Sequence, residues 1–140
     1  MNIDQKLKEI LLTSKTIASV GLSTNPAKES FGIVAYLKDH GYRIIPVNPT
    51  AAEILGEKAY PDLASVPGKV DVVQLFRRSE DVPPFVDEAI QIGAKVVWMQ
   101  EGISNDEAAR KAEAAGLTVV MDRCMRSEHR RLVASAPRQL

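Results

Sequence analysis

The chain has 140 residues, 45% of them hydrophobic and 26% charged, a composition typical of one globular domain spanning residues 1–140. Its 18 lysines and arginines balance 18 aspartates and glutamates, so no net charge attracts nucleic acid or an anionic membrane surface. One cysteine excludes an internal disulfide and, with only two histidines, a cysteine-rich four-ligand zinc site, so we expect a hydrophobic core and a reducing, cytoplasmic environment.

The N-terminal segment has the spacing of an amphipathic helix. Apolar residues recur at helical intervals from Ile3 to Leu11, which predicts a helix over about residues 4–14 with Asp4 as its N-cap. Charged residues interrupt this segment, and no apolar stretch of membrane-spanning length occurs in the sequence. We therefore expect neither a signal peptide nor a membrane-spanning helix.

Five short apolar runs follow the predicted helix. They are rich in valine and isoleucine and are largely continuous rather than alternating, which is typical of parallel strands covered on both faces. These runs occupy residues 17–21, 42–47, 70–76, 94–100 and 117–121.

Three segments with helical spacing lie between these runs. They span residues 30–40, 81–92 and 105–115 and are followed by Gly41, Gly93 and Gly116, which are suited to ending helices. Ser104 and Glu107 have the spacing of a capping box for the third helix. Strands and helices that alternate with short loops predict a three-layer, doubly wound α/β fold, with a mainly parallel five-stranded sheet and helices on both faces.

Two further segments are less regular. Residues 48–69 are rich in proline and glycine but keep some apolar residues, which indicates two short helical turns joined by loops. The C-terminal segment from Ser127 begins as a helix through Val133 and is expected to fray over about residues 134–140.

In an open parallel sheet, ligands bind at the carboxyl ends of the strands, where the strand order reverses. The loop after the first strand is rich in small and hydroxyl-bearing residues, including Gly21, Ser23, Thr24 and Asn25. It leads into a helix whose free N-terminal amides favour an anion. Without a G-x-G-x-x-G pattern, the loop is equally compatible with a phosphate cradle and with an ordinary turn.

The next two strands end in residues suited to a nucleotide. The second ends in Val47, Asn48 and Pro49, without the acidic residue that a nicotinamide dinucleotide site uses to hold the ribose 2′-hydroxyl. The third ends in Arg77 and Arg78, whose guanidinium groups can hold a phosphate or can pair with the acidic residues that follow them.

The later part of the chain carries weaker signals. Gln100 offers a hydrogen-bond donor and an acceptor, and Gly102 permits close backbone approach. Trp98 is interpreted as a core residue. Cys124 is interpreted as a buried, inert cysteine, with a reactive thiol near the crevice as the alternative.

The two histidines, His40 and His129, have no hydroxyl or thiol partner at a recognisable spacing, so both are interpreted as surface residues. The sequence also lacks a P-loop, a G-x-S-x-G elbow, an H-E-x-x-H pair and the protein-kinase motifs. It therefore indicates a binding site more clearly than a catalytic one, and it predicts no metal site.

Six segments together resemble the small, stand-alone CoA-binding proteins. They are GLSTNP at 21–26, PVNP at 46–49, LGEKAYPDL at 55–63, FRRSE at 76–80, VVWMQEGI at 96–103 and DRCMRSEHRRL at 122–132. The resemblance covers about residues 10–133. It extends to the CoA-binding domain of the succinyl-CoA synthetase alpha subunit and of ADP-forming acyl-CoA synthetases, and it implies a Rossmann-like domain that holds CoA across the strand ends.

The resemblance also implies which residues contact CoA. Those implied are Gly21 through Pro26 for phosphate and pantetheine, including Ser23, Thr24 and Asn25; Val47, Asn48 and Pro49 for adenosine; Phe76, Arg77 and Arg78 for the nucleotide; and Met99, Gln100, Glu101 and the adjoining Gly102 for the pantetheine arm. The synthetase has a lysine shortly after its second strand, in a position where this chain reads Thr50-Ala51-Ala52. The candidates for holding the 3′-phosphate here are therefore Lys28, Arg77 and Arg78.

The leading functional hypothesis is a protein that binds CoA or an acyl-CoA without a recognisable catalytic apparatus, since the synthetase carries its phosphorylated histidine in a second domain. One alternative is a redox or nucleotide sensor that binds NAD(H) and signals through a protein partner. Another is an acyl-transfer enzyme that uses Cys124 as its nucleophile. We expect a small-molecule ligand rather than nucleic acid or membrane, and the sequence leaves both a monomer and a homodimer open.

Overall fold

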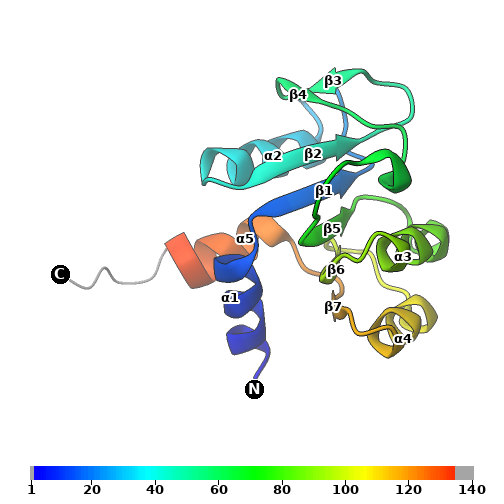
Figure 1. The fold of residues 1–140 in the computed structure, drawn as a ribbon. Helices are drawn as coiled ribbons and strands as arrows, with labels where there is room; N and C mark the ends of the chain where they lie inside the picture. The colour runs from blue at the N-terminus through cyan, green and yellow to red at the C-terminus, as the bar shows by residue number, and fades with distance from the viewer. Residues whose placement is uncertain (1, 135–140) are drawn as a thin grey trace.

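The computed structural model describes residues 2–134, in which helices cover both faces of a parallel sheet (Figure 1). The main elements are α1 (Ile3–Thr13), β1 (Thr16–Val20), α2 (Glu29–Asp39), β2 (Arg43–Val47), β5 (Val72–Leu75), α3 (Val82–Gln91), β6 (Val96–Met99), α4 (Asp106–Ala114), β7 (Thr118–Val120) and α5 (Met125–His129). The predicted α/β fold is confirmed, and the predicted bounds of the five strands, α1, α2, α3 and α4 fall within two residues of the observed ones.

The strands lie in the order β2-β1-β5-β6-β7, and every neighbouring pair is parallel. This is the strand order of the flavodoxin-like doubly wound sheets. The order reverses between β1 and β5, so the chain leaves these two strands toward opposite faces of the sheet. A crevice is expected at their carboxyl ends for that reason.

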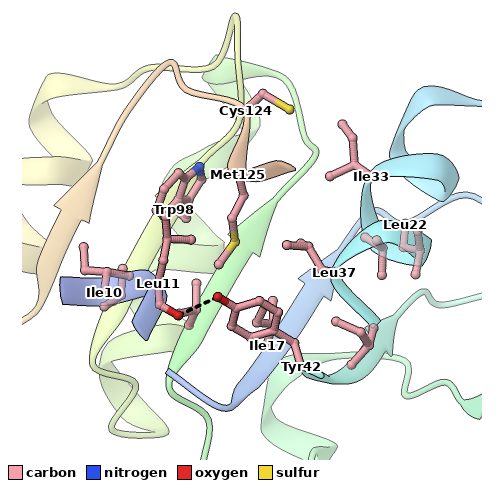
Figure 2. Close-up of a cluster of buried hydrophobic side chains, with 14 of the residues drawn as sticks. Ile10, Leu11, Ile17, Leu22, Ile33, Leu37, Tyr42, Trp98, Cys124 and Met125 are labelled. Atoms are coloured by element: carbon pink, nitrogen blue, oxygen red, sulfur yellow. Dashed lines mark hydrogen bonds between the residues drawn. The ribbon is translucent and has the colours of Figure 1, made fainter. Parts of the chain in front are cut away.

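Two hydrophobic layers sandwich the sheet. On one face α1, α2 and α5 pack around Trp98 and Met125, both fully buried (Figure 2). On the other face α3 and α4 pack against the sheet through valines and alanines. The predicted core position of Trp98 is confirmed, and its indole Nε1–H donates to the Arg123 carbonyl oxygen at 2.8 Å. The Tyr42 hydroxyl donates to the Leu11 carbonyl oxygen, which ties α1 to the start of β2 (Figure 2).

Two predicted helix caps are wrong. Asn2, rather than Asp4, is the N-cap of α1: its Oδ1 accepts from the Gln5 backbone N–H at 2.8 Å, and the Gln5 side chain accepts in return from the Asn2 N–H. Asn105 caps α4 in place of the box predicted from Ser104. In both cases an asparagine within two residues of the predicted one forms the cap, and asparagine is as good an N-cap as aspartate or serine.

The segment 48–69 contains one of the two predicted helical turns, the 3-10 turn Leu63–Ser65. The other is wrong, because β3 (Glu53–Ile54) and β4 (Glu57–Lys58) form a short antiparallel hairpin there. Leu55 and Gly56 connect these strands with φ of 57° and 74°. Positive φ at both central residues is characteristic of a two-residue hairpin turn.

The C-terminal helix continues beyond α5 as a π-helix over Arg130–Ala134. The fraying predicted from about residue 134 falls on residues 135–140, which lie outside the described residues. In residues 2–134, no helix combines the length and the apolar character that crossing a membrane requires.

The surface position predicted for His129 is wrong, whereas His40 is exposed as predicted. His129 is only 5% exposed because α5 packs across α2, and its Nδ1 lies 2.9 Å from the Tyr36 hydroxyl. Burial, followed by the proximity of His40, holds the pKa of His129 below its ordinary value. Tertiary packing between two distant helices therefore supplies the partner that the sequence spacing did not indicate.

Candidate functional site

A cleft of about 460 Å³ lies at the carboxyl ends of β1, β2 and β5, where the strand order reverses. Seven of the predicted site residues line it: Gly21, Ser23, Thr24, Val47, Asn48, Pro49 and Arg77. The remaining lining residues are Val20, Leu22, Thr50, Pro61 and Phe85. The topology therefore brings the ends of three separate strands into one concave surface of the size that small-molecule ligands occupy.

Gly21 forms the point of closest approach between the β1 loop and the end of β5. Its φ is +83°, and a Cβ at this position would lie 3.0 Å from Cδ of Arg77 and 3.1 Å from the carbonyl oxygen of Phe76. Its N–H donates to the Val47 carbonyl oxygen at 3.1 Å. Both the backbone conformation and the available space restrict this position to glycine.

The loop from β1 to α2 is organised by its own polar side chains. Ser23 Oγ accepts from the Asn25 N–H at 3.0 Å, and Asn25 Oδ1 accepts from the Ala27 N–H at 3.0 Å. The Ser23 N–H donates in turn to Ser30 Oγ at 3.1 Å. Lys28 is the N-cap residue of α2, but it makes no side-chain capping hydrogen bond. The first turn of α2 therefore keeps the N–H groups that favour an anion.

Asn48 fixes the opposite wall of the cleft. Its Nδ2 donates to the Leu22 carbonyl oxygen at 3.1 Å, and its Oδ1 accepts from the N–H and the hydroxyl of Thr50 at 2.9 and 3.0 Å. The side chain thus ties the end of β2 to the β1 loop. Pro49, beside it, is exposed and offers a flat apolar surface to the cleft.

The two arginines after β5 point to different surroundings. Arg77 lines the cleft, with its guanidinium carbon 5.6 Å from the centroid of the Phe85 ring and Nη2 3.9 Å from Asp81 Oδ2. Arg78 has a side chain that is 76% exposed, and its Nε lies 3.0 Å from Asp81 Oδ2 and 3.5 Å from Glu80 Oε1. These contacts, led by the hydrogen bond to Asp81, raise the pKa of Arg78. Arg77 is therefore the cation of the cleft, whereas Arg78 belongs to a surface ion-pair group.

A second, smaller pocket of about 100 Å³ lies on the other side of the α2 N-terminus. It is lined by Glu29, Ser30, Ile33, Gln100, Glu101 and Cys124. The Ser23–Ser30 hydrogen bond joins its wall to the wall of the cleft. Gln100 and Glu101 are thus separated from the predicted nucleotide residues by one helix terminus.

Gln100 ends a polar relay that crosses three strands beneath α2 and α5. Ser19 Oγ donates to Gln74 Oε1 at 2.8 Å, and Gln74 Nε2 donates to Gln100 Oε1 at 3.2 Å. The same Gln100 oxygen accepts from the Met125 N–H at 3.1 Å. All three polar side chains are buried, so the relay provides the partners that they require in the core.

Several predicted site residues lie outside both pockets. They are Asn25, Pro26, Lys28, Phe76, Arg78, Met99 and Gly102. Met99 is fully buried in the core on the α3 and α4 face, because alternate residues of a strand face opposite sides. Phe76 packs against the other core layer, and Gly102 forms a turn with φ of +84° whose N–H donates to Asp122.

Sequence reasoning missed Phe85 and Pro61 as lining residues. Phe85 belongs to the apolar stripe of α3, which predicted only a core position, and Pro61 follows the irregular hairpin segment, where no periodicity places a side chain. Cys124 is buried, as expected, and lines only the smaller pocket. Within residues 2–134, His, Cys, Asp and Glu side chains do not gather in groups of three or more that could hold a metal ion.

The fold, the reversal of strand order and the cleft at that point define an α/β domain of the Rossmann type with a ligand site at the strand ends. Residues 15–130 match the model of the CoA binding domain, and the chain belongs to this family.

Relatives of two kinds support this assignment. YneT from Bacillus subtilis is 44% identical over 124 residues, which cover 89% of this chain and 92% of YneT. The solved structure of a hypothetical protein from Pyrococcus horikoshii OT3 has 44% sequence identity to this chain and a TM-score of 0.91. The match covers 94% of this chain and 93% of that one. The ADP-forming acetate–CoA ligase II of Archaeoglobus fulgidus is 36% identical over 106 residues, 74% of this chain but only 16% of the ligase. The chain is thus homologous to the CoA-binding region of a much larger enzyme.

Proposed function

We propose that this protein binds CoA or an acyl-CoA at the carboxyl ends of β1, β2 and β5, with the nucleotide in the larger cleft and the pantetheine arm directed toward the smaller pocket. The proposal rests on one observation: this domain of the CoA-binding family has a cleft at its strand ends, and Arg77 lines that cleft. On this proposal the protein acts in the cytoplasm and its main partner is a small molecule. The proposal is compatible with a monomer and with a homodimer.

The residues present fit the chemistry of CoA. Its phosphates are anions, and the cleft offers the Arg77 guanidinium. The N-terminus of α2, which has no side-chain cap, is joined to the cleft wall by the Ser23–Ser30 hydrogen bond. Guanidinium groups and helix N-termini both bind phosphate in proteins. Val47, Pro49 and Phe85 supply the apolar surface that a purine base requires.

The ends of β2 and β5 favour CoA over NAD(H). In a nicotinamide dinucleotide site, a carboxylate after the second strand holds the ribose 2′-hydroxyl. Here Asn48 stands at that place, and its side-chain oxygen already accepts two hydrogen bonds from Thr50. The cation at the end of β5, Arg77, suits a phosphorylated ribose better than a free one.

Binding rather than catalysis is the activity that we propose. The match covers only 16% of the Archaeoglobus ligase, so the comparison does not carry the activity of that whole enzyme over to this chain. The acyl-transfer alternative depends on Cys124, which is buried and enters only the wall of the smaller pocket. It would gain support if CoA disulfide reacted with Cys124 in the folded protein.

Thermal unfolding with CoA, dephospho-CoA, NAD and AMP, each titrated separately, tests the proposal. A ligand present at 100 times its Kd adds about 2.7 kcal/mol of stability, which raises the Tm of a domain of this size by several degrees. We expect CoA to stabilise the protein at lower concentration than dephospho-CoA, because the two differ only in the 3′-phosphate. Stabilisation by NAD without stabilisation by CoA would reject the proposal in favour of the NAD(H) sensor.

A further inference from the structure

The two histidines of the sequence, His40 and His129, meet at one corner of the fold. His40 is the C-cap residue of α2, and His129 is the last residue of α5. Their ring centroids lie 5.1 Å apart, with 65° between the ring planes. The two residues are far apart in the sequence, so their proximity results from the packing of α5 across α2.

Tyr36 holds both imidazole rings through the same ring nitrogen. Its hydroxyl lies 2.9 Å from Nδ1 of His129, and its carbonyl oxygen lies 2.8 Å from Nδ1 of His40. Its ring also stacks on His40 at a centroid distance of 4.0 Å. With both Nδ1 atoms engaged, both Nε2 atoms remain without a hydrogen-bond partner in residues 2–134.

His40 and His129 both line a cavity of about 230 Å³. Its other lining residues are Leu11, Leu12, Ser14, Lys15, Gly41, Tyr42 and Val133. His129 is 95% buried, yet its Nε2 is not among the fully enclosed polar atoms that lack a partner, so this atom reaches accessible space.

The separation of the rings matches that of two imidazoles bound to one tetrahedral metal ion. With Zn–N bonds of about 2.0 Å and a tetrahedral angle, each ring centroid lies about 3 Å from the metal and the two centroids lie about 5 Å apart. The observed separation is 5.1 Å. A histidine ligand also typically hydrogen-bonds through its other ring nitrogen to a fixed partner, as both histidines do here with Tyr36.

We propose that His40 and His129 form a binding site for a divalent transition-metal ion, with both Nε2 atoms as ligands, Tyr36 positioning both rings, and water completing the coordination. Among residues 2–134, no carboxylate lines the cavity, so the site lacks the ligands that Mg²⁺ and Ca²⁺ prefer. Imidazole pairs instead suit Zn²⁺ and Ni²⁺. This site lies away from the strand ends and is independent of the proposed CoA cleft.

Titration of the full chain with Zn²⁺ tests the site directly. Because the chain has two histidines, a ¹⁵N spectrum of the imidazole nitrogens contains one set of signals for each. We expect one Zn²⁺ per chain, a shift of the Nε2 signals of both rings at saturation, and no shift with Mg²⁺ at the same concentration. This measurement uses the unmodified protein, so it does not depend on whether a His129 variant folds.

Three variants sharpen the test. His40→Gln removes an exposed ligand and is expected to abolish zinc binding in the range where the unmodified protein is saturated. Tyr36→Phe keeps the stacked ring but loses the hydroxyl at His129, and it is expected to weaken binding about ten-fold. Cys124→Ala is the matched control and leaves the affinity unchanged, because the thiol lies outside the cavity. Unchanged zinc affinity in His40→Gln, a shift confined to one ring, or no binding at millimolar Zn²⁺ would each overturn the proposal.

Discussion

Gly21 lies against Arg77 so closely that a Cβ on Gly21 would stand 3.0 Å from Cδ of the arginine. The contact places the β1 loop directly on the end of β5, at the point where the strand order reverses. We expect Gly21→Ala to lower the free energy of unfolding by about 2 kcal/mol, since alanine is strained at positive φ and also crowds Arg77. Denaturant unfolding at pH 7 measures this loss, and CoA affinity should fall with it.

Gly102→Ala is the matched control for this prediction. Gly102 has nearly the same backbone angle, with φ of +84°, but a Cβ there would meet no heavy atom within 4 Å. Alanine at this position therefore reports the backbone strain alone, about 1 kcal/mol. Equal losses in the two variants would show that the approach of Gly21 to Arg77 has no energetic consequence.

Arg77→Ala and Arg78→Ala remove the same charge from adjacent positions, but only Arg77 lines the cleft. Loss of a charge-assisted phosphate contact costs about 1.5–3 kcal/mol, so Arg77→Ala is expected to weaken CoA binding by about ten-fold or more. Arg78→Ala is expected to change it by less than about three-fold, since an exposed charge contributes little. Calorimetric titration of both variants with CoA and dephospho-CoA gives the comparison.

The same titrations show which phosphate of CoA contacts Arg77. If Arg77 holds the 3′-phosphate, the preference for CoA over dephospho-CoA disappears in Arg77→Ala and persists in Arg78→Ala. If Arg77 instead holds the pyrophosphate, both ligands lose affinity equally. CoA binding that is equal in the two variants and in the unmodified protein removes Arg77 from the site.

The difference between these two arginines shows where sequence reasoning stops. The continuous apolar runs predicted the five strands, because strands buried on both faces have no polar side to break the run. Parallel strands end at one edge, so the residues after them, such as Gly21, Asn48 and Arg77, were predicted to meet there, and the cleft does contain them. The Arg78 side chain instead pairs with Asp81 and Glu80 in the following turn. Sequence spacing alone does not show which of the two arginines enters the cleft.

The histidines show the same limit more strongly. His40 and His129 lie on different helices, and no local spacing relates them, so both were interpreted as isolated surface residues. Their contact depends on how α5 crosses α2, which is a property of the packed core rather than of either segment. The hairpin at Leu55 and Gly56 differs from the histidine pair, because a local residue signals it. Gly56 favours a turn, but the apolar residues around it have a spacing that also suits a helical turn.

Asp71 gives the fold a stability contribution that depends on pH. Burial disfavours its charged form, but the N–H donors of Lys15 and Thr16, at 2.8 and 3.0 Å, and the Lys95 ammonium outweigh burial and hold the pKa of the carboxyl below 3.8. A lowered folded-state pKa stabilises the fold at pH values above the unfolded pKa, and this stabilisation is lost as the pH falls through the folded pKa. Asp71→Asn is therefore expected to cost about 1–2 kcal/mol at pH 7.

Urea unfolding at several pH values checks this prediction. The difference between the unmodified protein and Asp71→Asn should be constant between pH 5 and pH 7 and should shrink below about pH 4. Asp87→Asn is the control: Asp87 pairs with Lys111 at 2.7 Å on an exposed surface, so its loss is expected to cost about 0.5 kcal/mol or less. A difference for Asp71→Asn that persists unchanged at pH 3 contradicts the assignment to the carboxylate charge.

The buried relay from Ser19 through Gln74 to Gln100 is expected to stabilise the core beside the smaller pocket. Gln100→Met keeps the approximate size of the side chain but removes the oxygen that accepts from Gln74 Nε2 and from the Met125 N–H. Two buried donors would lose their partner, so we expect a loss of about 2–4 kcal/mol in the free energy of unfolding. Gln91→Met, at an exposed position on α3, is the control and is expected to change stability by about 0.5 kcal/mol or less.

Gln100→Glu tests the acceptor oxygen of Gln100 separately from its amide nitrogen. A glutamate retains an oxygen for both donors, and those donors favour its charged form, so this variant is expected to keep more of the stability than Gln100→Met. Denaturant unfolding of the two variants at pH 7 gives the comparison. If Gln100→Met is as stable as the unmodified protein, the relay is not required to satisfy the core. If Gln100→Glu is the less stable variant, burial of the charge outweighs the two hydrogen bonds that hold it.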